Sequence, residues 1–513
     1  MVNELSSPSR ILSERQKSSV VVVGAGIGGL TAGALLAKQG YKVTIFDQAI
    51  VPGGCASTFK RQGFTFDVGA TQVAGLEPGG IHHRIFEELG IEPPKATYCD
   101  PSCAVFLPGE TTPINVWRDK DKWQAERQRQ FPGSEPFWNL LNRLFEASWR
   151  FQGRDPILPP RSAWDLWQLI SAVRPDTLIT VPFTLMTVAD ALKLYGLYED
   201  KRLKTFLDLQ LKLYSQVGTD ETALLYAATA LAVSQAPQGL FHLEGSMQVL
   251  SDRLVTGLQK YGGKLLMRHS VEEIHTASGK ATGVTVHNQK TGETRTETAE
   301  MIVANVTAQN LVELTKDKAL NNYQRRLDKL TQPSGAFVVY LGVKRAAIPP
   351  DCPPHLQFLY NQDEIIGENN SLFVSVSKPG DGRAPEGKAT IIASSFTNVD
   401  LWDREDKEYA RIKQQYTEEE IARLGEYFDL TDDNLVYVEA ATPRTFVRYT
   451  ARDKGIVGGL GQRIPTFGPF GFANRTPIKN LWLVGDSTHP GEGTAGVSYS
   501  ALTVTRQIEQ IHK

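Results

Sequence analysis

Three glycines near the start of the chain have the spacing of a phosphate-binding turn. They are Gly24, Gly26 and Gly29 in the stretch VVVVGAGIGGL, where an apolar run ends and a helical pattern begins. In such a turn the first glycine permits a tight bend, the second lets the backbone approach a pyrophosphate, and the third allows close helix–strand packing. The following helix offers free N–H groups to the phosphates. Asp47 then supplies a carboxylate that can accept hydrogen bonds from ribose hydroxyls and disfavours a 2′-phosphate.

The segments around this turn are the elements that must position it. Residues 19–23 form a β-branched run that suits a strand buried on both faces. Apolar residues then recur at helical spacing until Gly40, and residues 42–46 predict a second strand. A strand–helix–strand unit of this length implies a parallel sheet, so the predicted fold class is α/β. A chance glycine-rich turn is the alternative, and these flanking patterns disfavour it.

A second glycine-rich turn lies at the far end of the chain, in LWLVGDSTHPGEGTAGVSYSAL (residues 481–502). A short apolar strand runs into Gly485 and Asp486, and a helical pattern follows around Gly496 and Val497. A helix that begins there presents free N–H groups and partial positive charge, which stabilise electron density on a reduced ring. Two such turns can hold the two ends of one long cofactor. A simple strand-to-helix connector is the alternative.

Another glycine pair, Gly53 and Gly54, follows Asp47 in QAIVPGGCASTF. This part of the chain resembles the superfamily of FAD-binding amine oxidases and carotenoid desaturases, where such a pair lies close to the nucleotide. In that superfamily a Gly-Asp after a late strand holds the ribityl chain, so Asp486 would accept a ribityl hydroxyl hydrogen bond. The resemblance therefore implies FAD as the cofactor. An ordinary surface turn at Gly53 is the alternative reading.

Four segments carry a more specific resemblance, to the phytoene-desaturase-like carotenoid oxidoreductases. They are GFTFDVGAT (63–71), GLFHLEGSMQVLSDRL (239–254), GGKLLMRHSVEEI (262–274) and LVGDSTHPGEGTAGVSYSA (483–501). They cover nearly the whole chain in the right order, and the group of C-3′,4′ desaturases and prolycopene isomerases is the most similar. The resemblance implies that the backbone of Val271 lies beside the adenine. Relatives often have Gly-Gly-Arg where this chain has Cys55, so a phosphate-side cation is either missing or supplied by Arg61.

The strand-rich, dinucleotide-type sequence occurs in three separated stretches, and helix-rich sequence fills the gaps. We expect a discontinuous Rossmann-type FAD-binding domain made of residues 19–82, 240–330 and 465–513. A second, α+β substrate or lid domain is then made of residues 83–239 and 331–464. The polar residues 1–18 predict a disordered tail and no signal peptide.

Composition excludes several classes of function. The net charge of −2 gives no electrostatic reason to expect a nucleic-acid partner. The four cysteines are too few and too scattered for a disulfide framework or a metal site. No run of about 18 apolar residues occurs, so we expect no transmembrane helix.

Residues 156–190 form a candidate membrane-facing patch. They contain Trp164, Trp167 and many aliphatic side chains, flanked by Arg161 and Arg174. Tryptophans favour the headgroup level and bases favour anionic lipid, so the segment predicts a peripheral, monotopic contact on the cytoplasmic side of a membrane. A carotenoid substrate would strengthen this reading, because such a molecule dissolves in lipid. An amphipathic element packed within the second domain is an equal alternative.

Several hypotheses about function stay open. The first is an FAD-dependent carotenoid desaturase of the C-3′,4′ type. In such an enzyme the protein aligns the substrate and excludes water, and it needs no catalytic triad. The second is cis–trans isomerisation of a carotenoid by reduced flavin. The third, from another class, is a flavin-free escort protein that binds prenyl groups, and an amine oxidase is a fourth. His489 and His242 are more readily explained as structural histidines than as proton relays.

Overall fold

The computed structural model describes residues 18–512, so the expected disordered tail at residues 1–18 lies almost wholly outside the described residues. Its first unit consists of β1 (Ser19–Val23), α2 (Ile27–Lys38) and β2 (Lys42–Asp47). The two strands pair in parallel, with Val21 opposite Thr44. The predicted strand–helix–strand unit is therefore confirmed, and with it the α/β class.

A five-stranded parallel sheet collects its strands from distant parts of the chain. The strand order is β10-β2-β1-β14-β20, and every pair in it is parallel. The three later strands are β10 (Lys264–Met267), β14 (Met301–Ala304) and β20 (Leu481–Leu483). Because all strands run in one direction, their carboxyl ends meet at one edge, where open α/β sheets bind ligands.

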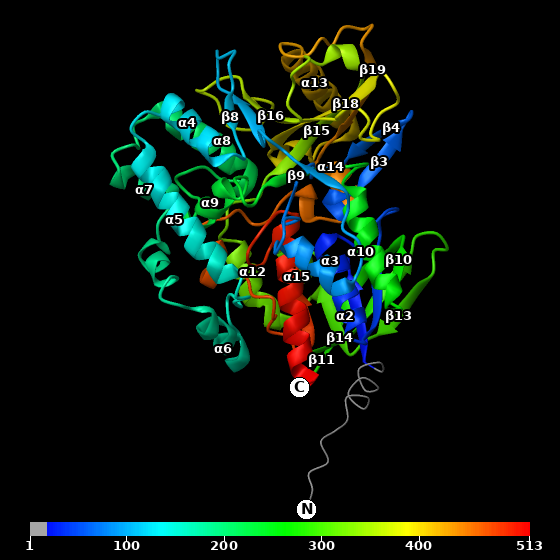
Figure 1. The fold of residues 1–513 in the computed structure, drawn as a ribbon. Helices are drawn as coiled ribbons and strands as arrows, with labels where there is room; N and C mark the ends of the chain where they lie inside the picture. The colour runs from blue at the N-terminus through cyan, green and yellow to red at the C-terminus, as the bar shows by residue number, and fades with distance from the viewer. Residues whose placement is uncertain (1–17, 513) are drawn as a thin grey trace, which may run out of the picture.

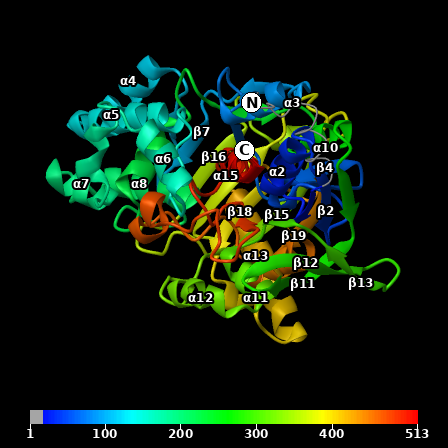
Figure 2. The ribbon, with the colours of Figure 1, turned by 90° about the horizontal axis from the view of Figure 1, so that it is seen from below.

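Helices cover one face of this sheet and a small antiparallel sheet covers the other (Figures 1 and 2). On the first face lie α2, α3 (Ile81–Leu89), α10 (Gln248–Lys260) and α15 (Thr494–Glu509). On the second lie α11 (Ala308–Thr315), α12 (Asn321–Leu327) and the sheet of β11 (His269–Ala277), β12 (Lys280–Asn288) and β13 (Thr294–Thr298).

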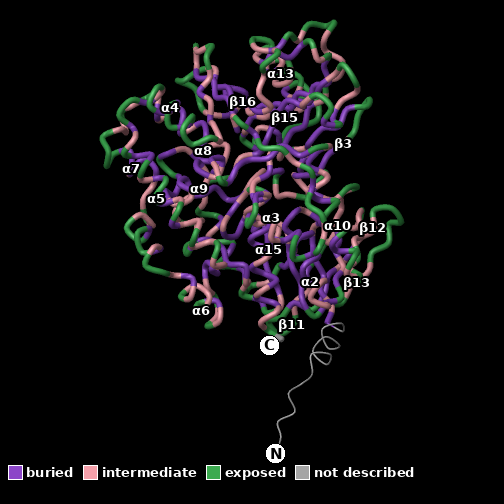
Figure 3. Tube along the Cα trace, in the orientation of Figure 1, coloured by how far each residue is buried: buried purple, intermediate pink, exposed green. Residues whose placement is uncertain are grey.

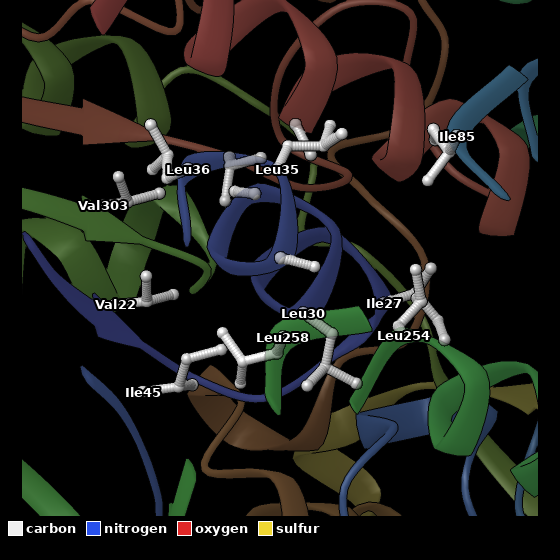
Figure 4. Packing of buried hydrophobic residues seen from close by; sticks show 14 of the residues in the cluster. Val22, Ile27, Leu30, Leu35, Leu36, Ile45, Ile85, Leu254, Leu258 and Val303 are labelled. Carbon is white, nitrogen blue, oxygen red and sulfur yellow. The ribbon is translucent and has the colours of Figure 1, made fainter. Parts of the chain in front are cut away.

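Successive residues of the strands face opposite sides of the sheet, which explains why both faces are covered. Val22 and Val303 point into the helical layer, where they pack with Leu30 and Leu254 (Figure 4). Their neighbour Val21 belongs to the cluster on the opposite face. A strand that is buried on both sides is apolar at every position, which is why its sequence shows no alternation.

The second large sheet is mixed and has seven strands. Its strand order is β19-β15-β18-β17-β16-β7-β8. The bounds are β7 (Cys103–Phe106), β8 (Ile114–Val116), β15 (Gly335–Lys344), β16 (His355–Leu359), β17 (Ser371–Val376), β18 (Lys388–Thr397) and β19 (Leu435–Ala441). The long helix α13 (Asp406–Leu424) packs on one side of it.

A group of helices between residues 120 and 232 flanks the seven-stranded sheet (Figure 1). They are α4 (Lys120–Gln130), α5 (Glu135–Gln152), α6 (Ala163–Ala172), α7 (Val188–Leu194), α8 (Lys201–Ser215) and α9 (Leu224–Ala232). Most of them share one buried core, whereas α6 lies at the edge of the molecule and carries many exposed residues (Figure 3). Within residues 18–512, no helix is both long enough and apolar enough to cross a bilayer.

Short strands and a buried ionic network join the two sheets. The hairpin of β3 (Thr58–Arg61) and β4 (Phe64–Asp67) and the sheet of β5 (Val73–Ala74), β9 (Leu240–Leu243) and β6 (Ala96–Tyr98) lie between them. Buried Arg383 follows β17 and reaches Asp67 at 3.2 Å and Asp381 at 3.3 Å. These ion pairs fix the position of the two large sheets relative to each other.

Candidate functional site

The first glycine turn is built around Asn305, which follows β14. Gly24 has a φ of 96°, and a Cβ on it would lie 2.6 Å from the carbonyl oxygen of Asn305. A Cβ on Gly26 would lie 2.8 Å from Asn305 Nδ2, and one on Gly29 would overlap the carbonyl of Gly24. Helix α2 begins here without a side-chain cap. Its first N–H groups therefore stay available to an anion.

Asp47 and the second glycine pair close around the same turn. The Asp47 carboxylate accepts hydrogen bonds from the backbone N–H of Ala25 at 2.6 Å and of Ala49 at 2.7 Å. Burial raises the pKa of Asp47, and the two amides oppose that rise. The N–H of Gly53 donates to the carbonyl of Ala25 at 2.8 Å. The geometry thus sets a carboxylate with free lone pairs beside the start of α2.

The glycine turn from the far end of the chain meets this first turn. A Cβ on Gly28 would lie 3.3 Å from the carbonyl oxygen of Val497, and the hydroxyls of Thr31 and Ser498 are 3.5 Å apart. Helix α15 also lacks a side-chain cap and has no acidic residue in its first turn. Two uncapped helix starts, from opposite ends of the chain, therefore face one region.

A single cavity of about 730 Å³ joins these features. Ten of the residues expected to contact a cofactor lie on its wall: Gly24, Gly26, Asp47, Gly53, Gly54, Val271, Gly485, Asp486, Gly496 and Val497. Gly29 does not line the cavity, as expected for a glycine whose role is to let the helix pack closely on the strand. Long grooves of this kind, with glycines where a cofactor's backbone must approach closely, fit a dinucleotide.

The cavity continues into an apolar region beyond the glycine turns. Helices α5, α8 and α9 and the seven-stranded sheet supply its wall, which includes Trp149, Leu213, Tyr226, Val233, Val338, Phe373, Phe396 and Phe467. A smaller cavity of about 40 Å³ adjoins it and shares Leu213, Phe373 and Phe396. This apolar lining suits a long hydrocarbon.

Arg452 is a cation in this cavity that the sequence did not single out. It follows α14 (Pro443–Thr450), and its Nη2 lies 2.8 Å from Oδ2 of Asp486. Its guanidinium also donates to the carbonyls of Ile456 and Gly458. The alternative cation, Arg61, is half-exposed, lies 3.5 Å from Glu439 and does not line the cavity. No motif surrounds Arg452, so only the fold reveals it.

The two histidines weighed from the sequence are placed as structural groups. His489 Nε2 lies 2.7 Å from the side-chain nitrogen of Gln152, and burial lowers the pKa of His489 to about 3. It stays neutral at physiological pH and its ring does not line the cavity. His242 lies 3.0 Å from Asp381 in the buried network between the sheets. Neither histidine holds a mobile proton at the site.

Glu492 and Gln216 are further residues of the site that were not predicted from the sequence. Both approach the same end of the cavity, where Gln216 Nε2 donates to Glu492 Oε2 at 3.1 Å. Glu492 stands within the glycine-rich stretch before α15, and that position was the one available signal. Among residues 18–512 no cluster of three or more metal-type ligands occurs.

Comparison with known proteins places these features in context. A family model described as an NAD(P)-binding Rossmann-like domain matches residues 22–89. Prolycopene isomerase 2 from an Oncidium hybrid cultivar is 27% identical over 508 residues, which cover 97% of this chain and 84% of that protein. The zeta-carotene-forming phytoene desaturase of Myxococcus xanthus is 26% identical over 515 residues, covering 96% and 94%.

Solved structures agree in fold. An oxidoreductase from Methanosarcina mazei superposes with a TM-score of 0.62 at 17% identity, covering 95% of this chain and all of that one. Taken with the matched family model, the site geometry supports an enzyme that uses a flavin dinucleotide.

Proposed function

We propose that this chain is an FAD-dependent enzyme whose substrate is a long carotenoid polyene, because relatives that match almost its whole length are named as prolycopene isomerases and phytoene desaturases. The observation that carries the proposal is one continuous cavity with two chemically different parts. One part has glycine turns and uncapped helix starts for a dinucleotide. The other has an apolar wall for a hydrocarbon.

The expected cofactor residues divide between the two halves of FAD. Gly24, Gly26 and the start of α2 would hold the pyrophosphate, with Asp47 at the adenosine ribose. Val271 would lie beside the adenine. These contacts occupy the carboxyl edge of the parallel sheet.

The ring half would lie against the late glycine turn. Gly485, Asp486, Gly496 and Val497 would border the ribityl chain and the ring. Arg452 would neutralise Asp486 and any negative charge that the bound cofactor brings. When bound, the flavin supplies a ring that can accept or return electrons at the end of the apolar region. The chain's own residues hold the polyene there and exclude water.

Isomerisation of a polyene double bond is the reaction that the comparisons favour first. The Oncidium relative bears the name of a prolycopene isomerase, and three further relatives with that name match at 26–27% identity. Isomerisation needs no final electron acceptor. Desaturation is the second candidate, because relatives named as desaturases cover 96% of the chain. Its C-3′,4′ position rests on the sequence resemblance alone.

Expression in bacteria that make lycopene and related carotenes separates these candidates. Isomerisation gives pigments of unchanged mass and altered retention, whereas desaturation gives pigments two hydrogens lighter that absorb at longer wavelength. A purified protein that is yellow and releases flavin on boiling supports the enzyme. A colourless protein that binds polyenes without changing them would instead identify a flavin-free binding protein of the escort type.

The apolar segment around α6 is proposed as the surface that meets a membrane. Seven large apolar side chains between residues 166 and 185 are exposed, among them Trp167 (63%) and Leu185 (66%). On the inner side of α6, buried Asp165 pairs with Arg475 at 3.0 Å. The helix thus turns its charge inward and its apolar side outward, the reverse of a water-facing helix. A carotenoid could enter from lipid beside it.

A further inference from the structure

Glu492 occupies the junction between the dinucleotide part of the cavity and its apolar part. From the first part, Asp486 and Arg452 lie within electrostatic reach of its carboxyl. From the second, Tyr226 of α9 lies close enough to interact with its charge. Gln216, which follows α8 and does not line the cavity, donates a hydrogen bond to it. We propose that Glu492 is the residue that gives a proton to the polyene and removes another from the same carbon during isomerisation, an inference that rests on the proposed function.

The backbone around Glu492 is shaped to present this side chain. Its two neighbours, Gly491 and Gly493, have φ values of 115° and 86°, which side-chain-bearing residues rarely adopt. Gly458 has a φ of 67°, and a Cβ on it would overlap both Gln216 Nε2 and Glu492 Oε2. The space that this glycine leaves open is therefore filled by the Gln216–Glu492 hydrogen bond. Three glycines serve the placement of one carboxyl group.

One oxygen of the carboxyl group has no hydrogen-bond partner in the part of the chain that the structure describes. Glu492 Oε2 accepts the hydrogen bond from Gln216, while Oε1 is buried and has no hydrogen-bond partner among residues 18–512. A buried carboxyl oxygen without a partner is costly as an anion and favours the protonated form. Glu492 lines the cavity, so a hydrocarbon in the apolar part can come into contact with it.

The charges around Glu492 are consistent with a proton held near neutral pH. Burial raises the pKa of Glu492 to about 8, and the nearby Asp486 carboxylate adds to the rise. Hydrogen bonds from Gln216 and the backbone of Gly459 and the charge of Arg452 oppose it. Lys212 and Tyr226 are the other titratable groups that interact with it. A carboxylic acid whose pKa lies near the working pH is suited to both giving and receiving a proton.

The proposed step balances without any oxidant or reductant. The O–H bond of Glu492 breaks as a π-electron pair of the polyene forms a new C–H bond, which leaves a delocalised cation on the polyene. The former double bond is then single in character and rotates. After the rotation, the other C–H bond on the same carbon, the one already present in the substrate, breaks. Its electron pair restores the double bond in the new geometry, and that proton goes to the Glu492 carboxylate.

The test uses the holoenzyme with reduced flavin and a cis-carotenoid in detergent or lipid. E492Q keeps the shape and removes the exchangeable acid, so kcat should fall about 10²-fold or more while flavin content is unchanged. Wild-type kcat should decline as the pH rises through about 8, and residual E492Q activity should lack that decline. E420Q is the matched control, because Glu420 is also a buried carboxyl without partners but does not line the cavity.

Two readouts do not depend on comparing rates. The flavin absorption spectrum of the wild type should shift with an apparent pKa near 8, and E492Q should lose that transition. In D2O the wild type should place deuterium in the recovered carotenoid. Turnover in D2O without deuterium in the product, or E492Q activity within about threefold of wild type, overturns the inference. A wild type that is inactive on every carotenoid instead overturns the proposed function.

Discussion

Arg452 Nη2 lies 2.8 Å from Asp486 Oδ2, and both side chains line the cavity beside Cys55. The pair is largely buried, with 16% and 13% of the two side chains exposed, and Arg452 reaches it from the segment after α14, outside both glycine turns. The chain thus places a positive charge beside Cys55, the residue directly after the glycine pair. A guanidinium held by two backbone carbonyls as well as a carboxylate is a fixed charge.

Replacing Arg452 with glutamine should weaken both the fold and flavin binding. The change leaves Asp486 without its counter-charge, and breaking one side of a buried pair costs about 3–5 kcal/mol. We expect a lower melting temperature and flavin affinity reduced by at least about tenfold, measured by fluorescence titration of the apoprotein. R61Q is the control, since Arg61 is half-exposed and lies outside the cavity. An R452Q protein that retains flavin as tightly as wild type would contradict the assigned role.

Gly26→Ala should separate two roles of the first turn. Its φ of −68° suits alanine, but the new Cβ would lie 2.8 Å from Asn305 Nδ2. We expect a loss of about 1–3 kcal/mol in unfolding free energy, as for other overpacked sites. Adding N305A should restore stability but not flavin affinity, because the Cβ still occupies the space where a pyrophosphate approaches.

The control for that experiment is Gly29→Ala. Its Cβ would meet the backbone carbonyl of Gly24, which cannot move away as a side chain can. N305A should therefore fail to rescue G29A, as judged by thermal melts of both double variants. Equal rescue of the two variants would show that Asn305 does not discriminate between the positions.

Glu492 should make the folded protein less stable as the pH rises. Its pKa is raised from 4.5 to about 8 on folding, so the native state binds more protons than the unfolded chain between those values. The unfolding free energy contributed by this group is highest below the lower value, falls across the window and levels off above pH 8. E492Q should not show that decline. At alkaline pH its unfolding free energy should exceed that of wild type by roughly 2 kcal/mol or more.

Denaturant melts at acidic and alkaline pH measure this difference. The two proteins should agree at the acidic end and diverge as the pH rises. A constant difference at all pH values would mean that the carboxyl titrates normally in the folded state.

Charged substitutions on the α6 segment should weaken binding to vesicles. Trp167 and Leu185 expose apolar surface that lipid would cover, so W167E and L185E should reduce co-sedimentation with anionic phospholipid vesicles several-fold. I365E is the matched control, because Ile365 is similarly exposed, at 68%, but lies on a different part of the chain. Thermal stability should be unchanged in all three. Equal vesicle binding by all variants would leave the segment without a membrane role.

Local sequence patterns predicted much of the fold and the half of the site around the first glycine turn. The strand–helix–strand unit around Gly24 was predictable because the apolar run, the turn glycines and the helical spacing are contiguous. The exposed apolar face at residues 166–185 was harder to read, since a buried helix and a lipid-facing helix have the same composition.

By itself the sequence determined the two glycine turns, the acidic residue after the second strand and the class of cofactor, since each depends on residues close together in the chain. Only the tertiary structure decided that the two turns face one cavity, that Asn305 fills the space between them, that Arg452 enters it from outside both turns, and that Gln216 comes to lie beside Glu492. The physical reason is that burial and electrostatic partners arise from contacts across hundreds of residues. Those contacts fix the charge and proton affinity of a side chain, and no local pattern encodes them.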